Sequence, residues 1–190
     1  SPASLAVSVS AANLTGQNFT GTAANVAPTI ASAAAANPNP VVGTQAALSV
    51  LGADDGGEGA LLYTWSSSGP AAVSFSANGT NASKASTATF TQVGTYSVTV
   101  TVRDAGGLTT TSTVSVVVSP ALTTITITPG TASIPALGTA QFTASGKDQF
   151  GATLASQPAF TWTTSGGGTV NASGLYTAGA TAGGPYSVTA

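Results

Sequence analysis

The sequence predicts an all-β fold made of two β-sandwiches in tandem. Apolar residues alternate with serine and threonine along several segments, which is the pattern of strands with one buried face. Two blocks also recur in the same order, since residues 63–69 return as 160–166 and residues 94–100 return as 184–190. These copies lie roughly 95 residues apart, which is the size of one small sandwich.

Two segments precede the first full repeat. Residues 1–22 carry Leu5, Val7 and Val9 in alternation, so we expect a short strand that is either the tail of a preceding module or an N-terminal arm. Residues 23–40 are rich in alanine and proline. An alanine run of about one turn that is followed by prolines does not make a stable helix. We therefore expect an extended connection that includes the first strand of the next module.

The first sandwich is predicted over residues 41–119. Its expected strands are 47–51, 61–66, 71–76, 85–91, 95–103 and 109–118. The strand 95–103 has the clearest pattern, because β-branched and aromatic residues occupy every second position along its length. The residues that we expect to point inward from it are Tyr96, Val98, Val100 and Val102.

The second sandwich is predicted over residues 120–190 and is incomplete. Its expected inner residues are Ile125, Ile127, Ala140, Phe142, Ala144, Phe160, Trp162, Tyr186 and Val188. No segment matches strand 109–118 of the first repeat, so we expect a hydrophobic groove and an open sheet edge. Either the native chain continues, or a neighbouring molecule donates a strand. The short joint around Pro120 favours a semi-rigid rod.

The composition excludes several classes of function. Charged residues make up 4% of the chain and the formal net charge is −2. Three basic residues, Lys84, Arg103 and Lys147, cannot neutralise a nucleic-acid backbone. No apolar run is long enough to insert into a membrane. Without cysteine or histidine the usual nucleophiles and general bases are missing, so we do not expect an enzyme.

Four of the five acidic residues are candidates for a metal site. Asp54, Asp55 and Glu58 fall in one predicted loop and Asp104 in another, and the two loops meet at the same end of such a sandwich. Converging carboxylates favour a hard cation, so the sequence predicts a weak calcium site. The alternative is that these carboxylates cap backbone amides in turns. We predict no such site around Asp148.

Other side chains have structural interpretations. Trp65 and Trp162 share strand faces with apolar residues, so we expect them in the cores and not on a sugar-binding platform. A cross-link between Lys84 and an asparagine, assisted by an acid, is chemically possible. Glu58 lies far from Lys84 in the sequence, which argues against it.

Two family resemblances cover most of the chain. Residues 48–57, 62–65 and 94–108 resemble the PKD-repeat type of immunoglobulin-like (Ig-like) domain, which gives a module at about residues 28–119. One departure is that residues 66–69 lack the acidic turn that often follows the tryptophan of PKD repeats. Residues 120–190 resemble a truncated bacterial Ig-like domain of group 2, and the matching segments are 125–129, 142–144, 148–151, Trp162 and 174–178.

These resemblances imply Ig-like sandwiches with Greek-key connections, the last of them lacking its final strand. They also imply a large secreted or surface protein of bacteria. We expect a structural or spacer module of an extracellular surface, matrix or filament protein, whose partners are neighbouring modules or other copies of itself. The alternatives are an adhesive or glycan-binding module and an accessory region of a secreted enzyme.

Overall fold

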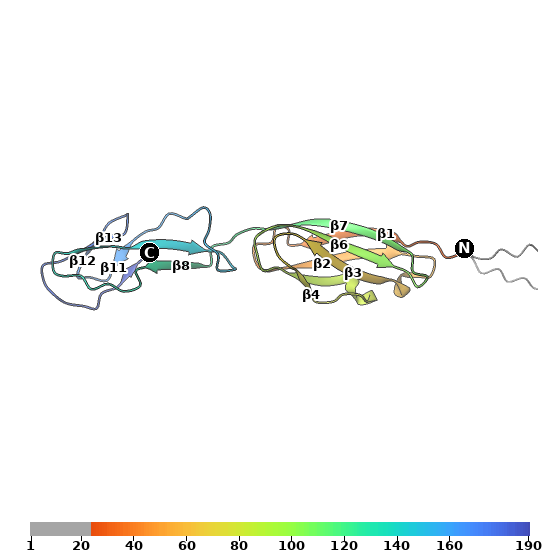
Figure 1. Ribbon diagram of the computed structural model, residues 1–190, viewed down its shortest axis with the longest axis horizontal. Coiled ribbons are helices and arrows are strands. Elements are labelled where there is room, and N and C mark those ends of the chain that lie inside the picture. The colour runs from red at the N-terminus through yellow and green to blue at the C-terminus, as the bar shows by residue number, and fades with distance from the viewer. Residues whose placement is uncertain (1–23) are drawn as a thin grey trace, which may run out of the picture.

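A computed structural model describes residues 24–190, and within this range the secondary structure is β-strands with two short 3-10 turns. The all-β prediction is therefore confirmed. Figure 1 shows two elongated units in line, with residues 24–118 at one end and the second unit beyond a short connection. The strand that we predict within residues 1–22 lies outside the described residues.

The first unit is a complete sandwich of two antiparallel sheets. Its elements are β1 (Thr29–Asn37), β2 (Gln45–Ala53), η1 (Glu58–Ala60), β3 (Leu62–Ser68), β4 (Ser74–Phe75), η2 (Asn81–Lys84), β5 (Ala85–Thr89), β6 (Gly94–Arg103) and β7 (Thr109–Val118). One sheet has the order β1-β2-β5-β4 and the other has the order β3-β6-β7. The alanine run within residues 33–36 lies in β1 and is not helical.

The core of the first unit lies between the inner faces of the two sheets. Along β6 the four predicted inward residues are each 0% exposed, and the hydroxyl side chains between them point outward. Leu48 and Phe90 face them from the other sheet. Burying one valine or leucine side chain contributes about 1.5–3 kcal/mol, so this alternation is sufficient to hold the sheets together.

Two aromatic residues join the core through hydrogen bonds. Trp65 is 2% exposed and its indole N–H donates to the carbonyl oxygen of Ser83 at 2.7 Å. Tyr96 is fully buried beside Phe90, and its hydroxyl donates to the carbonyl oxygen of Gln92 at 2.8 Å. This bond matches the tyrosine corner of Ig-like sandwiches. Trp65 is thus a core residue and cannot stack on a sugar.

The second unit repeats the topology of the first. Its strands are β8 (Thr124–Thr128), β9 (Thr139–Gln141), β10 (Thr143–Lys147), β11 (Thr163–Thr164), β12 (Gly168–Val170), β13 (Leu175–Ala178) and β14 (Val188–Thr189). They form the pairs β10-β8 and β11-β14 and the sheet β12-β13-β9. Thr163 pairs with Thr189 just as its equivalent Ser66 pairs with Thr99. The repeat seen in the sequence is therefore a repeat of strand register.

The second unit is packed less completely than the sequence predicts. Phe160 and Trp162 precede β11 instead of lying in a strand, and Trp162 is half-buried where we expect a core residue. Among the large apolar side chains of this unit, Phe142 and Tyr176 are buried, at 7% and 5% exposure. Within residues 24–190 the sheet of β11 and β14 has two short strands, where the first unit has three long ones.

Candidate functional site

The side chain of Gln149 makes hydrogen bonds across the joint between the two units. Gln149 accepts a hydrogen bond from the amide of Ala121 at 2.9 Å and donates to the carbonyl oxygen of Ser119 at 2.8 Å. The same side-chain amide also donates to the carbonyl oxygen of Gly43 in the first unit at 3.1 Å. Gln149 therefore ties the connection and the first unit to the second unit.

A tight turn after β10 presents Gln149. Asp148 is 4% exposed, and its Oδ1 accepts hydrogen bonds from the amides of Phe150 and Ala152, both at 2.9 Å. Gly151 has a φ of 80°, a conformation that favours glycine, and its amide closes the turn onto the carbonyl oxygen of Asp148. The turn fixes the direction in which the residues between Asp148 and Gly151 point.

Phe150 adds an apolar contact to the joint. It belongs to the second unit, yet its half-buried side chain packs against the core of the first unit. Sequence reasoning missed this role, because residues 148–151 contribute only to the family resemblance there. A buried aspartate followed three residues later by glycine is a turn signal, but nothing in it names the partner across the joint.

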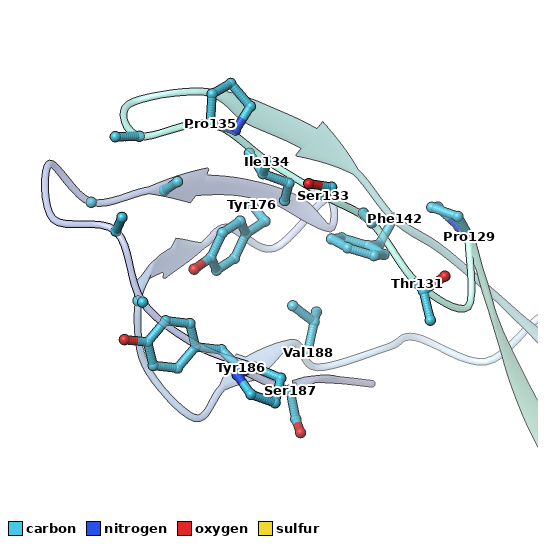
Figure 2. A pocket seen from close by; sticks show the side chains of 18 of the residues that line it. Pro129, Thr131, Ser133, Ile134, Pro135, Phe142, Tyr176, Tyr186, Ser187 and Val188 are labelled. Carbon is cyan, nitrogen blue, oxygen red and sulfur yellow. The ribbon is translucent and has the colours of Figure 1, made fainter.

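The second candidate site is an open groove of about 720 Å³ in the second unit. Figure 2 shows Phe142 and Tyr176 on one side of the groove, with Tyr186 and Val188 facing them. The segment 129–136 lines a third side, and none of the lining residues is charged. The groove that the sequence predicts is therefore present.

A comparison of the two units explains why the groove is open. In the first unit β7 pairs along the whole of β6, and its Val116 is 0% exposed. In the second unit β14 is the equivalent of β6, and within residues 24–190 its outer edge pairs with no strand. Tyr186 is consequently 48% exposed, whereas its equivalent Tyr96 is 0% exposed. The groove therefore borders β14, the strand whose counterpart β6 is paired along its whole length by β7.

Glu58 is the centre of a polar cluster in the first unit. Its carboxylate accepts hydrogen bonds from Lys84 Nζ at 2.9 and 3.1 Å, from the Tyr63 hydroxyl at 2.9 Å and from Asn81 Nδ2 at 3.1 Å. The bond from Lys84 is the main cause that lowers the pKa of Glu58, and the bond from Tyr63 adds to it. Burial raises the pKa of the Tyr63 hydroxyl. The cluster connects η1, β3 and η2.

The same geometry bears on the cross-link considered from the sequence. Lys84 Nζ lies 3.2 Å from the side-chain oxygen of Asn81, with Glu58 beside both. The side chains of Lys84 and Glu58 are 37% and 30% exposed. The Lys84–Glu58 contact is thus a salt bridge that solvent reaches, with the lysine nitrogen bonded to the carboxylate at 2.9 Å. The arrangement is an ion pair suited to holding two turns together.

The other acids that we propose as calcium ligands also bind their own loops. Asp104 is 3% exposed and accepts hydrogen bonds from Asn25 Nδ2 at 2.9 Å and from the Leu108 amide at 2.8 Å. Burial alone would raise the pKa of Asp104, but these bonds outweigh it and lower the pKa. Asp54 accepts from the Gly56 amide at 3.1 Å, and Asp55 is exposed.

The predicted calcium site stays a prediction without support from this geometry. Over the described range 24–190, no three acidic side chains come close enough to hold a metal ion together. Glu58 is already paired with Lys84, and both oxygens of Asp104 already accept hydrogen bonds from amides. The capping interpretation explains most of these contacts, and a calorimetric titration with millimolar Ca²⁺ is the direct test.

The facing sheets and the tyrosine corner define the first unit as an Ig-like sandwich. A family model for the PKD domain matches residues 31–117, from within β1 almost to the end of β7. This match supports the PKD-like Ig-like module predicted there. PKD domains are Ig-like modules typical of extracellular proteins and are often spacers or adhesion domains.

One further comparison and one property of the structure bear on the class of protein. No curated protein is significantly similar to the chain. Within residues 24–190 there is no helix with the length and apolarity that crossing a bilayer requires.

Proposed function

We propose that the chain is a structural spacer of a long extracellular bacterial surface, matrix or filament protein. In this proposal the second unit is a bacterial Ig-like module of group 2, and the chain associates with neighbouring modules or other copies of itself. It performs no catalysis. The PKD-domain match to the first unit and the near absence of charge on the chain support this assignment.

The joint is the observation that carries the proposal. A spacer must keep its ends apart, so its modules must resist bending where they meet. Gln149 makes three hydrogen bonds across the joint, and Phe150 adds apolar contact area. A connection that also contains Pro120 has few remaining ways to bend. These contacts favour a rod over two units on a flexible tether.

Small-angle X-ray scattering of the chain tests the proposal. At a concentration where the chain is monomeric, we expect the wild-type profile to be that of a single rod, and the double variant Gln149→Ala, Phe150→Ala to have a broader distribution of interatomic distances with a smaller mean. The control is Gln45→Ala, which removes an exposed side chain whose amide bonds Thr89 within one sheet. A wild-type profile that already fits freely jointed units would contradict the spacer function.

A further inference from the structure

We propose that Asn78 is a site of spontaneous deamidation that becomes reactive when the first unit opens around it. Asn78 is the one asparagine of the sequence that is followed by glycine. Because glycine has no side chain, the backbone nitrogen of Gly79 is less obstructed than the nitrogen that follows any other asparagine of the chain. The inference concerns the lifetime of the molecule and does not depend on the spacer function.

The reaction needs no enzyme and no reactant other than water. The backbone nitrogen of Gly79 attacks Cγ of Asn78, so that a new C–N bond closes a succinimide ring. The side-chain nitrogen of Asn78 leaves as ammonia and takes the proton of the Gly79 amide with it. Water then opens the ring at either of its carbonyl carbons. One product is aspartate, and the other is isoaspartate, in which the backbone runs through the former side chain and is longer.

In the folded chain both reacting groups are engaged in hydrogen bonds with β3. Oδ1 of Asn78 accepts from the amide of Trp65 at 2.6 Å, and its Nδ2 donates to the carbonyl oxygen of the same residue at 2.9 Å. The amide of Gly79 donates to the carbonyl oxygen of Tyr63 at 2.9 Å. Trp65 and Tyr63 are core residues, at 2% and 0% exposure. Ring closure therefore has to displace Asn78 and Gly79 from their bonds to a fixed strand.

Two buried serines hold the backbone on either side of the reactive pair. Ser86 is 5% exposed, and its hydroxyl donates to the carbonyl oxygen of Ala77 at 2.8 Å and accepts from the amide of Ala77 at 3.2 Å. Ser83 is 0% exposed, and its hydroxyl accepts from the amide of Thr80 at 3.2 Å. The pair itself is exposed to solvent. Its protection in the folded chain therefore comes from hydrogen bonds and not from burial.

The products cannot restore the contact with β3. An ionised carboxylate has no N–H to donate, so the carbonyl oxygen of Trp65 loses its partner and faces a negative charge. In isoaspartate the longer backbone also moves the amide of Gly79 relative to Tyr63. Deamidation thus follows an opening of the loop and then favours further opening, so the chemistry records the opening permanently.

Asn171 in the second unit provides a matched contrast. It is followed by alanine, and its side-chain oxygen accepts from the amides of Ser173 and Leu175, at 2.9 and 3.0 Å. These are bonds that the oxygen of an aspartate accepts equally well. Conversion of Asn171 should therefore be slower, and its product should fit the turn, whereas Asn78 uses its donor as well as its acceptor.

Peptide mapping by mass spectrometry tests whether the fold protects Asn78. The whole chain is incubated at mildly alkaline pH, folded in buffer or unfolded in guanidinium chloride, and Asn171 serves as the reference in the same digest. We expect Asn78 to convert at least about 10-fold faster in the unfolded chain, because a reaction of the opened state is limited by the population of that state. In the unfolded chain Asn78 should also react faster than Asn171. Equal rates for Asn78 in the two conditions overturn the proposal.

The variant Ser86→Ala separates protection by the fold from the effect of local sequence. It should raise the conversion rate of Asn78 in the folded chain at least about 3-fold, because the bonds to Ala77 are lost, and leave the rate in guanidinium chloride unchanged. Ser97→Ala, which changes an exposed serine of β6, is the matched control and should alter neither rate. A Ser86→Ala chain that is folded by circular dichroism and reacts at the wild-type rate contradicts the proposal. If this variant does not fold, the comparison of folded and unfolded wild type still decides.

The variant Asn78→Asp tests the effect of the product. It should lower the urea midpoint of the first unit, as followed by the fluorescence of Trp65 in a Trp162→Phe chain. Asn171→Asp is the same chemical change and should leave the midpoint of the second unit unchanged, as followed by Trp162 in a Trp65→Phe chain. A first unit that is equally stable with aspartate at this position would show that deamidation does not favour opening. The scattering test of the rigid rod is unaffected by these results and decides the spacer function separately.

Discussion

Asp104 and Asp148 are buried carboxylates that close turns in the same way in the two units. In each case the aspartate amide donates to the carbonyl oxygen of the residue four positions later, and Oδ1 accepts from the amide of that residue. Two of the five acidic residues of the chain thus have the same role, which is to close a turn. A carboxylate that accepts several amide hydrogen bonds holds its loop firmly.

The Glu58 cluster should make the stability of the first unit depend on acid. The pKa of Glu58 is lower in the folded state, so its contribution is fully present above the ordinary glutamate pKa and is lost as pH falls through the lower folded value. Asp104 adds to the same trend. We expect urea midpoints that are level near neutral pH and fall below about pH 4.

The variant Glu58→Gln isolates this contribution. It should lower the midpoint at pH 7 and reduce the fall between neutral and acid pH, because a neutral amide cannot pair with Lys84. Asp55→Asn, which changes an exposed loop residue, should keep the wild-type profile. A Glu58→Gln profile parallel to that of wild type would show that Glu58 does not titrate with folding.

At the scale of the element, β7 makes the first unit a closed sandwich. Its inner residues Val116 and Val118 are 0% and 1% exposed, whereas Val117 between them is 40% exposed. Adjacent valines in one strand therefore have opposite environments. This makes β7 a direct test of how much a filled groove contributes to a unit.

We expect Val116→Asp to destabilise the first unit by at least about 3 kcal/mol, because it buries an unpaired charge. Val117→Asp is the matched control and should change the free energy of unfolding by less than about 1 kcal/mol. Urea denaturation followed by the fluorescence of Trp65 measures both. Similar losses of unfolding free energy in the two variants would show that the inward position of Val116 is no more important to the unit than the outward position of Val117.

The sequence predicts elements well where the alternation is long. The strand 95–103 was expected from its valines and threonines, and β6 begins one residue earlier and ends at Arg103. The strand expected around Phe160 and Trp162 is reduced to Thr163–Thr164 in β11. In the first unit Trp65 and Tyr63 pair with Val100 and Val102, and by the repeat the counterparts of these two partners are Ala190 and a position after the last residue of the sequence.

At the scale of the whole molecule, the two units should unfold separately. The first has an extensive buried core, whereas the second has an open groove and few fully buried side chains. With one tryptophan in each unit, Trp162→Phe reports on the first and Trp65→Phe on the second. We expect the second unit to unfold at a lower urea concentration, so that the wild-type transition has two steps.

The tryptophan variants can themselves change the stability of the unit that they alter. Trp65→Phe removes the indole hydrogen bond to Ser83 and should cost the first unit about 1–3 kcal/mol. Circular dichroism of the wild type, which does not depend on either tryptophan, should show the same two steps. A single transition that coincides for all probes would show that the joint couples the units into one cooperative fold.

The groove, the Glu58–Lys84 pair and the joint differ in how well they can be predicted from the sequence. The groove lies beside β14, which the repeat of residues 94–100 as 184–190 already marks as the counterpart of β6. The Glu58–Lys84 pair joins residues 26 positions apart, and the Gln149–Gly43 contact joins residues 106 positions apart. No repeat or alternation in the sequence relates residues at either of these separations. The contacts of the joint are even harder to predict from the sequence, because the acceptors of Gln149 are backbone carbonyls, which every residue possesses.

That last property has a consequence for how such chains are assembled in evolution. Gln149 recognises the first unit through main-chain atoms of Gly43 and Ser119, not through their side chains. A following module that carries its own Asp148–Gly151 turn can therefore dock onto predecessors of quite different sequence. Shuffling or duplication of modules would leave these hydrogen bonds of the joint intact, whatever the side chains at positions 43 and 119.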